Sequence, residues 1–142
     1  MACMDSEPLK LLKILCNCEH LLTVPEFHWP EFLSASKTEE TACIEMNISP
    51  KLHWFNGHFP GQPVLPGVAQ THWAALLAPA LFNLQGEFSG LTRLKFKTPL
   101  LPGQKVFLQL TNKPSRHLIN YRYHSDDADF SSGTLHFVEQ TA

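Results

Sequence analysis

The predicted fold rests on one stretch, HFPGQPVLPGVAQTHW, which runs from His58 to Trp73. Three prolines in it, Pro60, Pro63 and Pro66, stand three residues apart, and an apolar run follows the last of them. Proline fixes its own φ angle and favours an extended conformation at the residue before it. We therefore expect a stiff, polyproline-like segment that has little conformational freedom to lose on folding.

A helix is predicted directly after the prolines, beginning at Pro66-Gly67 and continuing through VAQTHWAALL. Proline is tolerated in the first helical turn, where its missing N–H would have had no intrahelical partner. Pro79 is expected to kink or end this helix. Five residues recur at helical spacing and are predicted to form one continuous face: Val68, Ala69, His72, Leu76 and Ala80.

Strands are predicted on both sides of the helix. Between residues 41 and 49 an apolar face alternates with a polar one, which is the pattern of a half-buried strand. The apolar face consists of Ala42, Ile44, Met46 and Ile48. Further strands are expected at residues 91–98, 105–111, 117–124 and 134–139, with a turn at residues 99–103. One central helix and four or five antiparallel strands predict an α+β fold.

The first 40 residues give weaker signals. Leu9–Cys16 indicates a short helix or an edge segment, and Pro25 and Pro30 are expected to break any regular element after it. With 142 residues the chain has the length of one domain, so we expect a single domain over residues 1–142.

The composition argues against several function classes. A formal net charge of −2 argues against a protein that coats nucleic acid. No apolar run approaches the roughly 20 residues that span a bilayer, and the opening residues lack the basic region of a secretory signal. Four cysteines fit neither a disulfide framework nor a complete zinc site: Cys3, Cys16, Cys18 and Cys43. A cytoplasmic protein with reduced thiols is expected.

The proline segment is predicted to hold His58 at a set distance from the helix start. Backbone N–H groups there lack intrahelical partners and lie at the positive end of the helix dipole. Gly67 has no Cβ, so a ligand oxygen can approach them closely. A base opposite such amides suits a carbonyl that becomes negatively charged during reaction.

Three alternatives for these residues stay open. Each histidine could be an ordinary core or surface residue. The PxxP spacing could be an SH3 ligand. His53, His58 and His72 could together bind a metal, although no acidic or cysteine ligand stands at a supporting spacing.

The same stretch resembles the β-hydroxyacyl-acyl-carrier-protein dehydratases of fatty-acid synthesis, which have the hot-dog fold and the signature HFPxxPVxPG. The matching residues are Phe55, Gly57, His58, Phe59, Pro60, Pro63, Val64, Pro66, Gly67 and Val68. A second match, LKFKTPLLPGQKV from Leu94 to Val106, is similar to the family's basic strand, bend and next strand. The similarity covers residues 41–139, and residues 1–40 match poorly. The letters VAQTHW also resemble the dehydratase-like proteins of aryl-polyene gene clusters.

The resemblance implies an antiparallel sheet wrapped around a central helix, with two subunits that pair and share two active sites at their interface. It implies that His58 removes the proton beside the thioester and that the Gly67 N–H binds the thioester carbonyl. The family's third group is a carboxylate on the partner's helix, 14 residues after the histidine, and His72 stands at that position here. No acidic residue occurs between Glu45 and Glu87 to replace it. We expect His72 to act mostly as a neutral imidazole that donates a hydrogen bond to the leaving hydroxyl.

The remaining site predictions concern the acyl chain and its carrier. Four residues are predicted to bind the substrate: Phe59, Val68, Trp73 and Leu76. Each of them could equally pack under the sheet. Three basic residues are predicted to project from one strand face and to attract an acidic acyl carrier protein: Arg93, Lys95 and Lys97. A solvated strand face is the alternative.

The predicted activity is the dehydration of a 3-hydroxyacyl thioester on acyl carrier protein to the trans-2-enoyl thioester. We expect a lyase with no cofactor and no metal. A homodimer or an assembly of dimers is expected, and a heterodimer stays open; nucleic acid and membranes are not expected partners. Two other functions are retained: an acyl thioesterase of the same fold, and a non-catalytic partner subunit that binds acyl chains.

Overall fold

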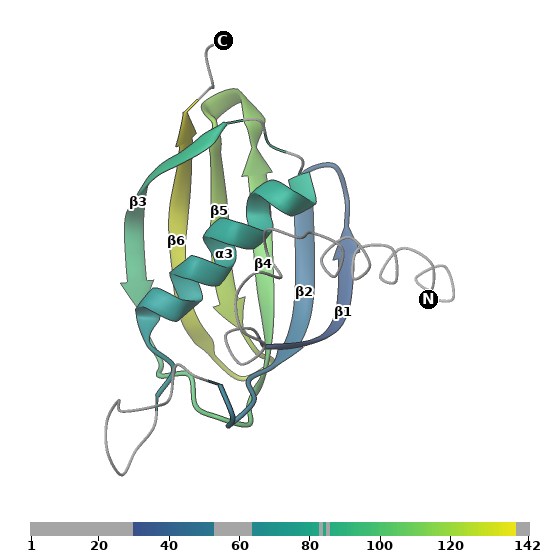
Figure 1. Ribbon diagram of the computed structural model, residues 1–142, viewed down its shortest axis with the longest axis vertical. Helices are drawn as coiled ribbons and strands as arrows, with labels where there is room; N and C mark the ends of the chain where they lie inside the picture. Colours follow the sequence, from purple (N-terminus) through teal and green to yellow (C-terminus); the bar gives the residue numbers. More distant parts are fainter. Residues whose placement is uncertain (1–29, 53–63, 83, 85, 139–142) are drawn as a thin grey trace.

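A computed structural model of the protein describes residues 30–52, 64–82, 84 and 86–138. Within these residues one α-helix, α3, lies across one face of an antiparallel sheet (Figure 1). The elements are β1 (Glu31–Lys37), β2 (Thr41–Asn47), α3 (Gly67–Phe82), β3 (Glu87–Phe96), β4 (Lys105–Lys113), β5 (Leu118–His124) and β6 (Asp129–Val138). A short 3-10 turn, η4 (Pro114–Arg116), connects β4 to β5.

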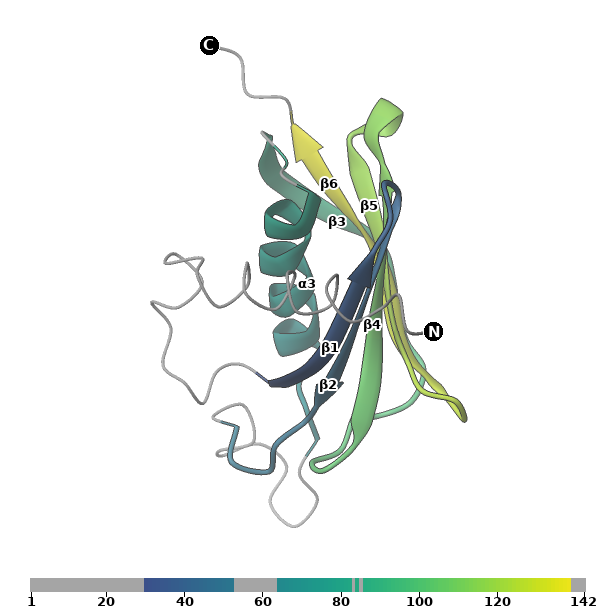
Figure 2. The ribbon, with the colours of Figure 1, turned by 90° about the vertical axis from the view of Figure 1, so that its right-hand side faces the viewer.

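The sheet has six strands in the order β1-β2-β4-β5-β6-β3, and each neighbouring pair is antiparallel. Helix α3 covers one face, and no described element lies over the other (Figure 2). A six-stranded antiparallel sheet packed on one central helix is the hot-dog fold, so the predicted fold class is confirmed. In the part of the chain that the structure describes, no helix is both long and apolar enough to cross a membrane.

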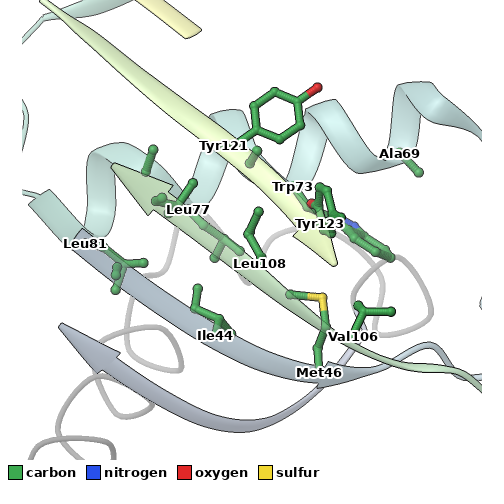
Figure 3. Packing of buried hydrophobic residues seen from close by; sticks show 14 of the residues in the cluster. Ile44, Met46, Ala69, Trp73, Leu77, Leu81, Val106, Leu108, Tyr121 and Tyr123 are labelled. Atoms are coloured by element: carbon green, nitrogen blue, oxygen red, sulfur yellow. The ribbon is translucent and has the colours of Figure 1, made fainter. Parts of the chain in front are cut away.

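The core lies between α3 and the sheet (Figure 3). Ile44 on β2 pairs with Leu108 on β4, and both belong to one buried cluster with Trp73 and Leu77 of α3. None of these four side chains is more than 1% exposed. Complete burial of an aliphatic side chain stabilises the fold by about 1.5–3 kcal/mol. The apolar face predicted for residues 41–49 is confirmed, since every second residue from 42 to 48 is buried.

Helix α3 is longer than predicted. It continues to Phe82, so Pro79 does not end it. Proline removes one backbone donor from a helix, but Ala78 and Leu81, which flank Pro79, are buried against the sheet. Tertiary packing therefore holds the last turn in place. Beyond the helix, the amide of Leu84 donates a hydrogen bond of 3.1 Å to the carbonyl of Pro79.

The face predicted from five residues is not the buried face of α3. Of its five residues only Ala69 is buried, whereas His72 is exposed and Val68 is 66% exposed. The face that is buried consists of Ala69, Gln70, Thr71, Trp73, Ala74, Leu77, Ala78 and Leu81. The helix has no charged residue and carries apolar residues on all sides. Its sequence period therefore gives little indication of which side is buried.

Strands β1, β3 and β6 depart from the prediction. Strand β3 covers Glu87–Phe96 and not residues 91–98. Strand β1 was not expected, because Pro30 was taken to break regular structure, yet Pro30 immediately precedes β1. Proline is tolerated at the start of an edge strand, and β1 is at the edge of the sheet. Strand β6 begins at Asp129, before the expected start at residue 134. Its early residues Ser131 and Ser132 look like loop residues in the sequence, although Ser131 is buried.

Candidate active site

The predicted helix start is confirmed, because Gly67 is the first residue of α3. In the first turn the amides of Ala69 and Gln70 donate to the carbonyl of Pro66, at 3.1 and 3.4 Å. The amides of Gly67 and Val68 have no hydrogen-bond acceptor among the residues that the structure describes. They lie at the positive end of the helix dipole, where an oxygen of a ligand can accept from them.

A cavity of ≈ 510 Å³ opens beside this helix start. It is lined by Val64, Leu65, Pro66, Gly67, Gln70, Phe96, Lys97, Thr98 and Pro99. The lining is mostly apolar, and its polar residues are Gln70, Lys97 and Thr98. Sites for small molecules are typically apolar cavities of about 300–1,000 Å³ with a few placed polar groups. The cavity therefore suits an apolar ligand that carries one polar end.

The position of Gly67 leaves no room for a side chain unless the Phe96 ring moves. A Cβ built on Gly67 would lie 2.6 Å from Cε1 of Phe96 and 2.7 Å from Cζ of the same ring. The segment before the helix is also fixed, since the amide of Leu65 donates a hydrogen bond of 2.7 Å to the carbonyl of Leu100. The cavity wall is thus built from the helix start and the end of β3.

The structure separates the predicted site residues on α3. His72 is exposed on the helix, and Leu76 is half-buried one turn further on. Trp73 is completely buried in the core. Of the predicted helix residues only Gly67 lines the cavity; His72, Val68, Trp73 and Leu76 do not. The described residues therefore give Trp73 a packing position, which its large apolar ring favours.

Two predicted site residues lie outside the described residues. These are the proposed base His58 and the proposed substrate contact Phe59. His53, which the metal alternative would need, also lies there. Across residues 30–52, 64–82, 84 and 86–138, no three His, Cys, Asp or Glu side chains gather closely enough to hold a metal ion.

The three basic residues expected on one strand face line two different hollows. Lys95 pairs with Ser132, and Ser132 pairs with Arg122. The side chains next to Arg122 on its strand point into the core. Lys95, Ser132 and Arg122 therefore lie on the sheet face away from α3. Arg93, Lys95 and Arg122 line a groove of ≈ 670 Å³ there, whereas Lys97 lines the cavity at Gly67.

A bulge and the strand end interrupt the alternation on which that prediction rests. The register of β3 against β6 shifts between Thr92 and Lys95, and Arg93 has a φ of 55°, which is rare for a residue other than glycine. The strand also ends at Phe96, before Lys97. Simple alternation along the sequence does not hold across a bulge or beyond a strand end.

Gln70 and Phe96 are among the residues of the cavity wall that were not predicted as site residues. Gln70 is 3% exposed although it is polar. The only signal for it is an amide side chain in a helix that is otherwise largely apolar. Phe96 was expected only as an apolar strand residue, and nothing local indicates that its ring contacts Gly67.

The geometry can be compared with known proteins. The family model of the ApeI-like proteins, described as ApeI dehydratase, matches residues 34–134. The chain belongs to the ApeI-like dehydratase family. Among solved structures, the dehydratase heterocomplex ApeI:P from Xenorhabdus doucetiae is 34% identical with a TM-score of 0.73, and the match covers 78% of this chain and 99% of that one. An uncharacterised protein from Erwinia carotovora subsp. atroseptica is 33% identical with a TM-score of 0.67, over 78% and 97%.

Curated relatives include 3-hydroxyacyl-acyl-carrier-protein dehydratases FabZ. The chain is 36% identical to that of Ligilactobacillus salivarius over 85 residues, which are 55% of this chain and 61% of the relative. It is 39% identical to that of Moorella thermoacetica over 77 residues, which are 48% of this chain and 52% of the relative. The match thus spans between about half and three-fifths of these relatives' length. The predicted kinship with hot-dog dehydratases and with their aryl-polyene branch is confirmed.

Proposed function

We propose that this protein dehydrates a 3-hydroxyacyl thioester, carried on an acyl carrier protein, to the trans-2-enoyl thioester. One observation carries the proposal: the Gly67 amide, at the start of α3, has no acceptor among the described residues and borders a mostly apolar cavity. A thioester carbonyl needs such a donor when its oxygen gains negative charge. Membership of a dehydratase family supports the same reaction.

The reaction needs three groups. His58 removes the proton from the carbon beside the thioester, and the Gly67 N–H stabilises the negative charge that develops on the thioester oxygen. The electron pair left on the α-carbon then forms the new carbon–carbon double bond, while the bond between the β-carbon and its hydroxyl breaks and its own pair leaves with the hydroxyl. His72 donates an N–H hydrogen bond to the hydroxyl, which leaves as water with the proton that His58 took from the α-carbon. General acid and base groups of this kind each contribute about 10²–10⁴-fold.

The exposure of His72 supports a site shared between two chains. His72 does not line the cavity of its own chain and is exposed on α3, so it is available to the site of a partner. The edge strand β3 carries exposed apolar side chains, among them Phe88, Leu94 and Phe96. An exposed strand edge with apolar residues is a surface for pairing with another chain. We therefore propose a dimer that forms along β3.

The carrier protein is proposed to approach the cavity at Lys97. Lys97 lines the cavity, and its positive charge, which also acts on Asp129, attracts the phosphate and the acidic surface of a carrier. Arg93 and Lys95 lie on the other face of the sheet, so their contribution is limited to long-range attraction.

The activity is tested by incubating the full chain with a 3-hydroxyacyl carrier protein and following its mass. We expect loss of one water from the acyl group with the wild-type protein and none with His58→Ala. No loss of water with the wild type would refute the proposal, as would equal loss with His58→Ala. Release of free acid would instead identify a thioesterase.

A second candidate is an acyl-binding subunit that works with a catalytic partner. Two observations favour it: His72 stands where the related dehydratases are expected to have a carboxylate, and one similar structure is a dehydratase heterocomplex. In that case the chain alone is inactive and a mixture with the partner is active. A chain that is active alone, at a rate that the partner does not raise, excludes this candidate.

A further inference from the structure

We propose that Gln70 is a positioning residue, which fixes the start of α3 so that the Gly67 amide points at the substrate carbonyl. This inference rests on the proposed function, because it concerns how accurately that amide is held. Gln70 does not take part in the chemistry. Its contacts join the helix start to two strands of the sheet and to the segment before the helix.

Gln70 makes three hydrogen bonds outside its own helix. Its side-chain Nε2 donates to the carbonyl of Leu65 at 3.3 Å. Its side-chain Oε1 accepts from the hydroxyl of Ser131 at 2.5 Å. Its main-chain carbonyl accepts from the hydroxyl of Tyr123 at 2.7 Å. One residue therefore connects α3 with β6, with β5 and with the residues that lead into Gly67.

The network is buried, so it favours one position of the helix start over others. Gln70 is 3% exposed, Ser131 2% and Tyr123 0%. A buried polar group is costly unless it is hydrogen-bonded, by about 1–3 kcal/mol on the evidence of protein mutations, so alternative positions of the helix start that break these bonds are disfavoured. Burial also raises the pKa of Tyr123, so its hydroxyl keeps the proton that it donates.

The network connects the two walls of the cavity, the end of β3 and the start of α3. Ser131 pairs with Phe96 in the sheet, and the Phe96 ring lies against Gly67. The bond from Ser131 to Gln70 therefore links the strand that carries Phe96 to the helix that begins at Gly67. If it is lost, the distance between the amide and the opposite wall is no longer fixed.

The test uses Gln70→Met, which keeps the length of the side chain and removes both polar ends, and Ser131→Ala, which removes the partner hydroxyl alone. The substrate is a 3-hydroxyacyl N-acetylcysteamine thioester, so that no carrier is needed. We expect kcat to fall on the order of tenfold or more for Gln70→Met and less for Ser131→Ala, with KM nearly unchanged, because displacement of a positioned group acts on the chemical step. An equal kcat in the wild type and both variants would overturn the inference.

A matched control separates positioning from general loss of stability. Thr134→Val removes another largely buried hydroxyl on β6, whose bond of 2.7 Å goes to Asn120 and not to the helix. We expect its kcat for the same thioester to equal that of the wild type at a temperature where all variants are folded by circular dichroism. If Thr134→Val lowers kcat as much as Ser131→Ala does, the effect belongs to the sheet as a whole and the inference is wrong.

A second readout does not need turnover. The infrared stretch of an isotope-labelled thioester carbonyl, bound as the enoyl N-acetylcysteamine thioester, reports the hydrogen bond that it accepts. We expect a lower frequency in the wild type than in Gln70→Met. If the wild type binds but does not dehydrate, the proposed function fails while this shift still tests Gln70; identical frequencies in the two proteins refute the role of Gln70 alone.

Discussion

Phe96 and Gly67 are in contact across the gap between β3 and α3, with no room for a Cβ between them. Phe96 is nevertheless 56% exposed, so its ring can swing outward when the space is taken. A substitution at Gly67 should therefore change the shape of the cavity and leave the core intact.

We expect Gly67→Ala to fold and to lose activity. Alanine is favoured over glycine in a helix by about 1 kcal/mol, so the melting temperature should change little. The displaced ring and the new methyl group narrow the cavity, and kcat/KM should fall on the order of tenfold or more. Adding Phe96→Ala to the same chain should restore part of that loss. Activity of Gly67→Ala equal to the wild type would show that this cavity does not hold the thioester.

Substitutions of His72 test whether this residue takes the place of the carboxylate that the family has at its position. His72→Ala should lower kcat on the order of 10²-fold because the leaving hydroxyl loses its donor, while the free energy of unfolding changes by less than about 0.5 kcal/mol, as is usual for an exposed residue. His72→Glu introduces the carboxylate that the family resemblance implies and should keep activity at or above the wild-type rate. Unchanged turnover in both variants would mean that His72 has no part in the reaction.

Two neighbouring tyrosines should respond oppositely to loss of their hydroxyls. Tyr123→Phe removes the buried bond to Gln70, so the free energy of unfolding in urea should fall by about 1 kcal/mol. The buried hydroxyl of Tyr121 has no partner in the described part of the chain, and burial raises the pKa of Tyr121 to about 12. Tyr121→Phe should therefore be neutral or stabilising. A larger loss for Tyr121→Phe than for Tyr123→Phe would contradict this assignment.

The ion pair between Arg122 and Asp129 should make stability depend on pH at the acid end. The hydrogen bond from Arg122 is the main cause that lowers the pKa of the Asp129 carboxyl below its ordinary value. The folded state thus favours the ionised form, so the stabilisation is present above the unfolded pKa of about 3.9 and is lost as the pH falls through the lower folded value. Urea midpoints of the wild type and Asp129→Asn should differ at neutral pH and converge in acid. A difference between the two urea midpoints that grows as the pH falls would contradict the predicted pH dependence.

Lys97 and Lys95 should differ in their effect on a carrier-borne substrate. Lys97 lines the cavity and Lys95 the groove on the far face of the sheet. We expect Lys97→Glu to raise KM for the acyl carrier protein several-fold at low salt, and less at high salt where charges are screened. Lys95→Glu serves as the matched control with a smaller effect. KM for the N-acetylcysteamine thioester should stay the same in both variants. If Lys95→Glu raises KM for the carrier protein more than Lys97→Glu does, the carrier binds at the other face of the sheet.

Much of the fold could be predicted because its signals are local. The alternation around Ile44 and the same pattern around Leu108 each mark a strand with one buried face. The start of α3 could be placed at Gly67 because proline is favoured at the beginning of a helix. The errors arose where local rules compete with packing: Pro79 lies inside the helix, and Pro30 lies directly before a strand.

The candidate site was only partly predictable, for a related reason. The role of Gly67 could be predicted from the motif and from the unpaired amides at a helix start. Gln70 depends on Ser131, which lies 61 residues further along the chain, and no local pattern relates these two positions. Lys97 was expected on the strand face of Arg93, but the strand ends at Phe96, and alternation does not position the residues beyond a strand end.

The end of β3 belongs both to the border of the sheet and to the wall of the cavity. Phe96 closes the strand, and Lys97, Thr98 and Pro99 continue along the cavity. Because β3 is bonded to β6 alone among the described strands, a further strand on its other side would adjust the twist of this segment and with it the width of the opening. Dilution that separates assembled chains would then lower the rate per molecule, even though every residue of each chain remains folded.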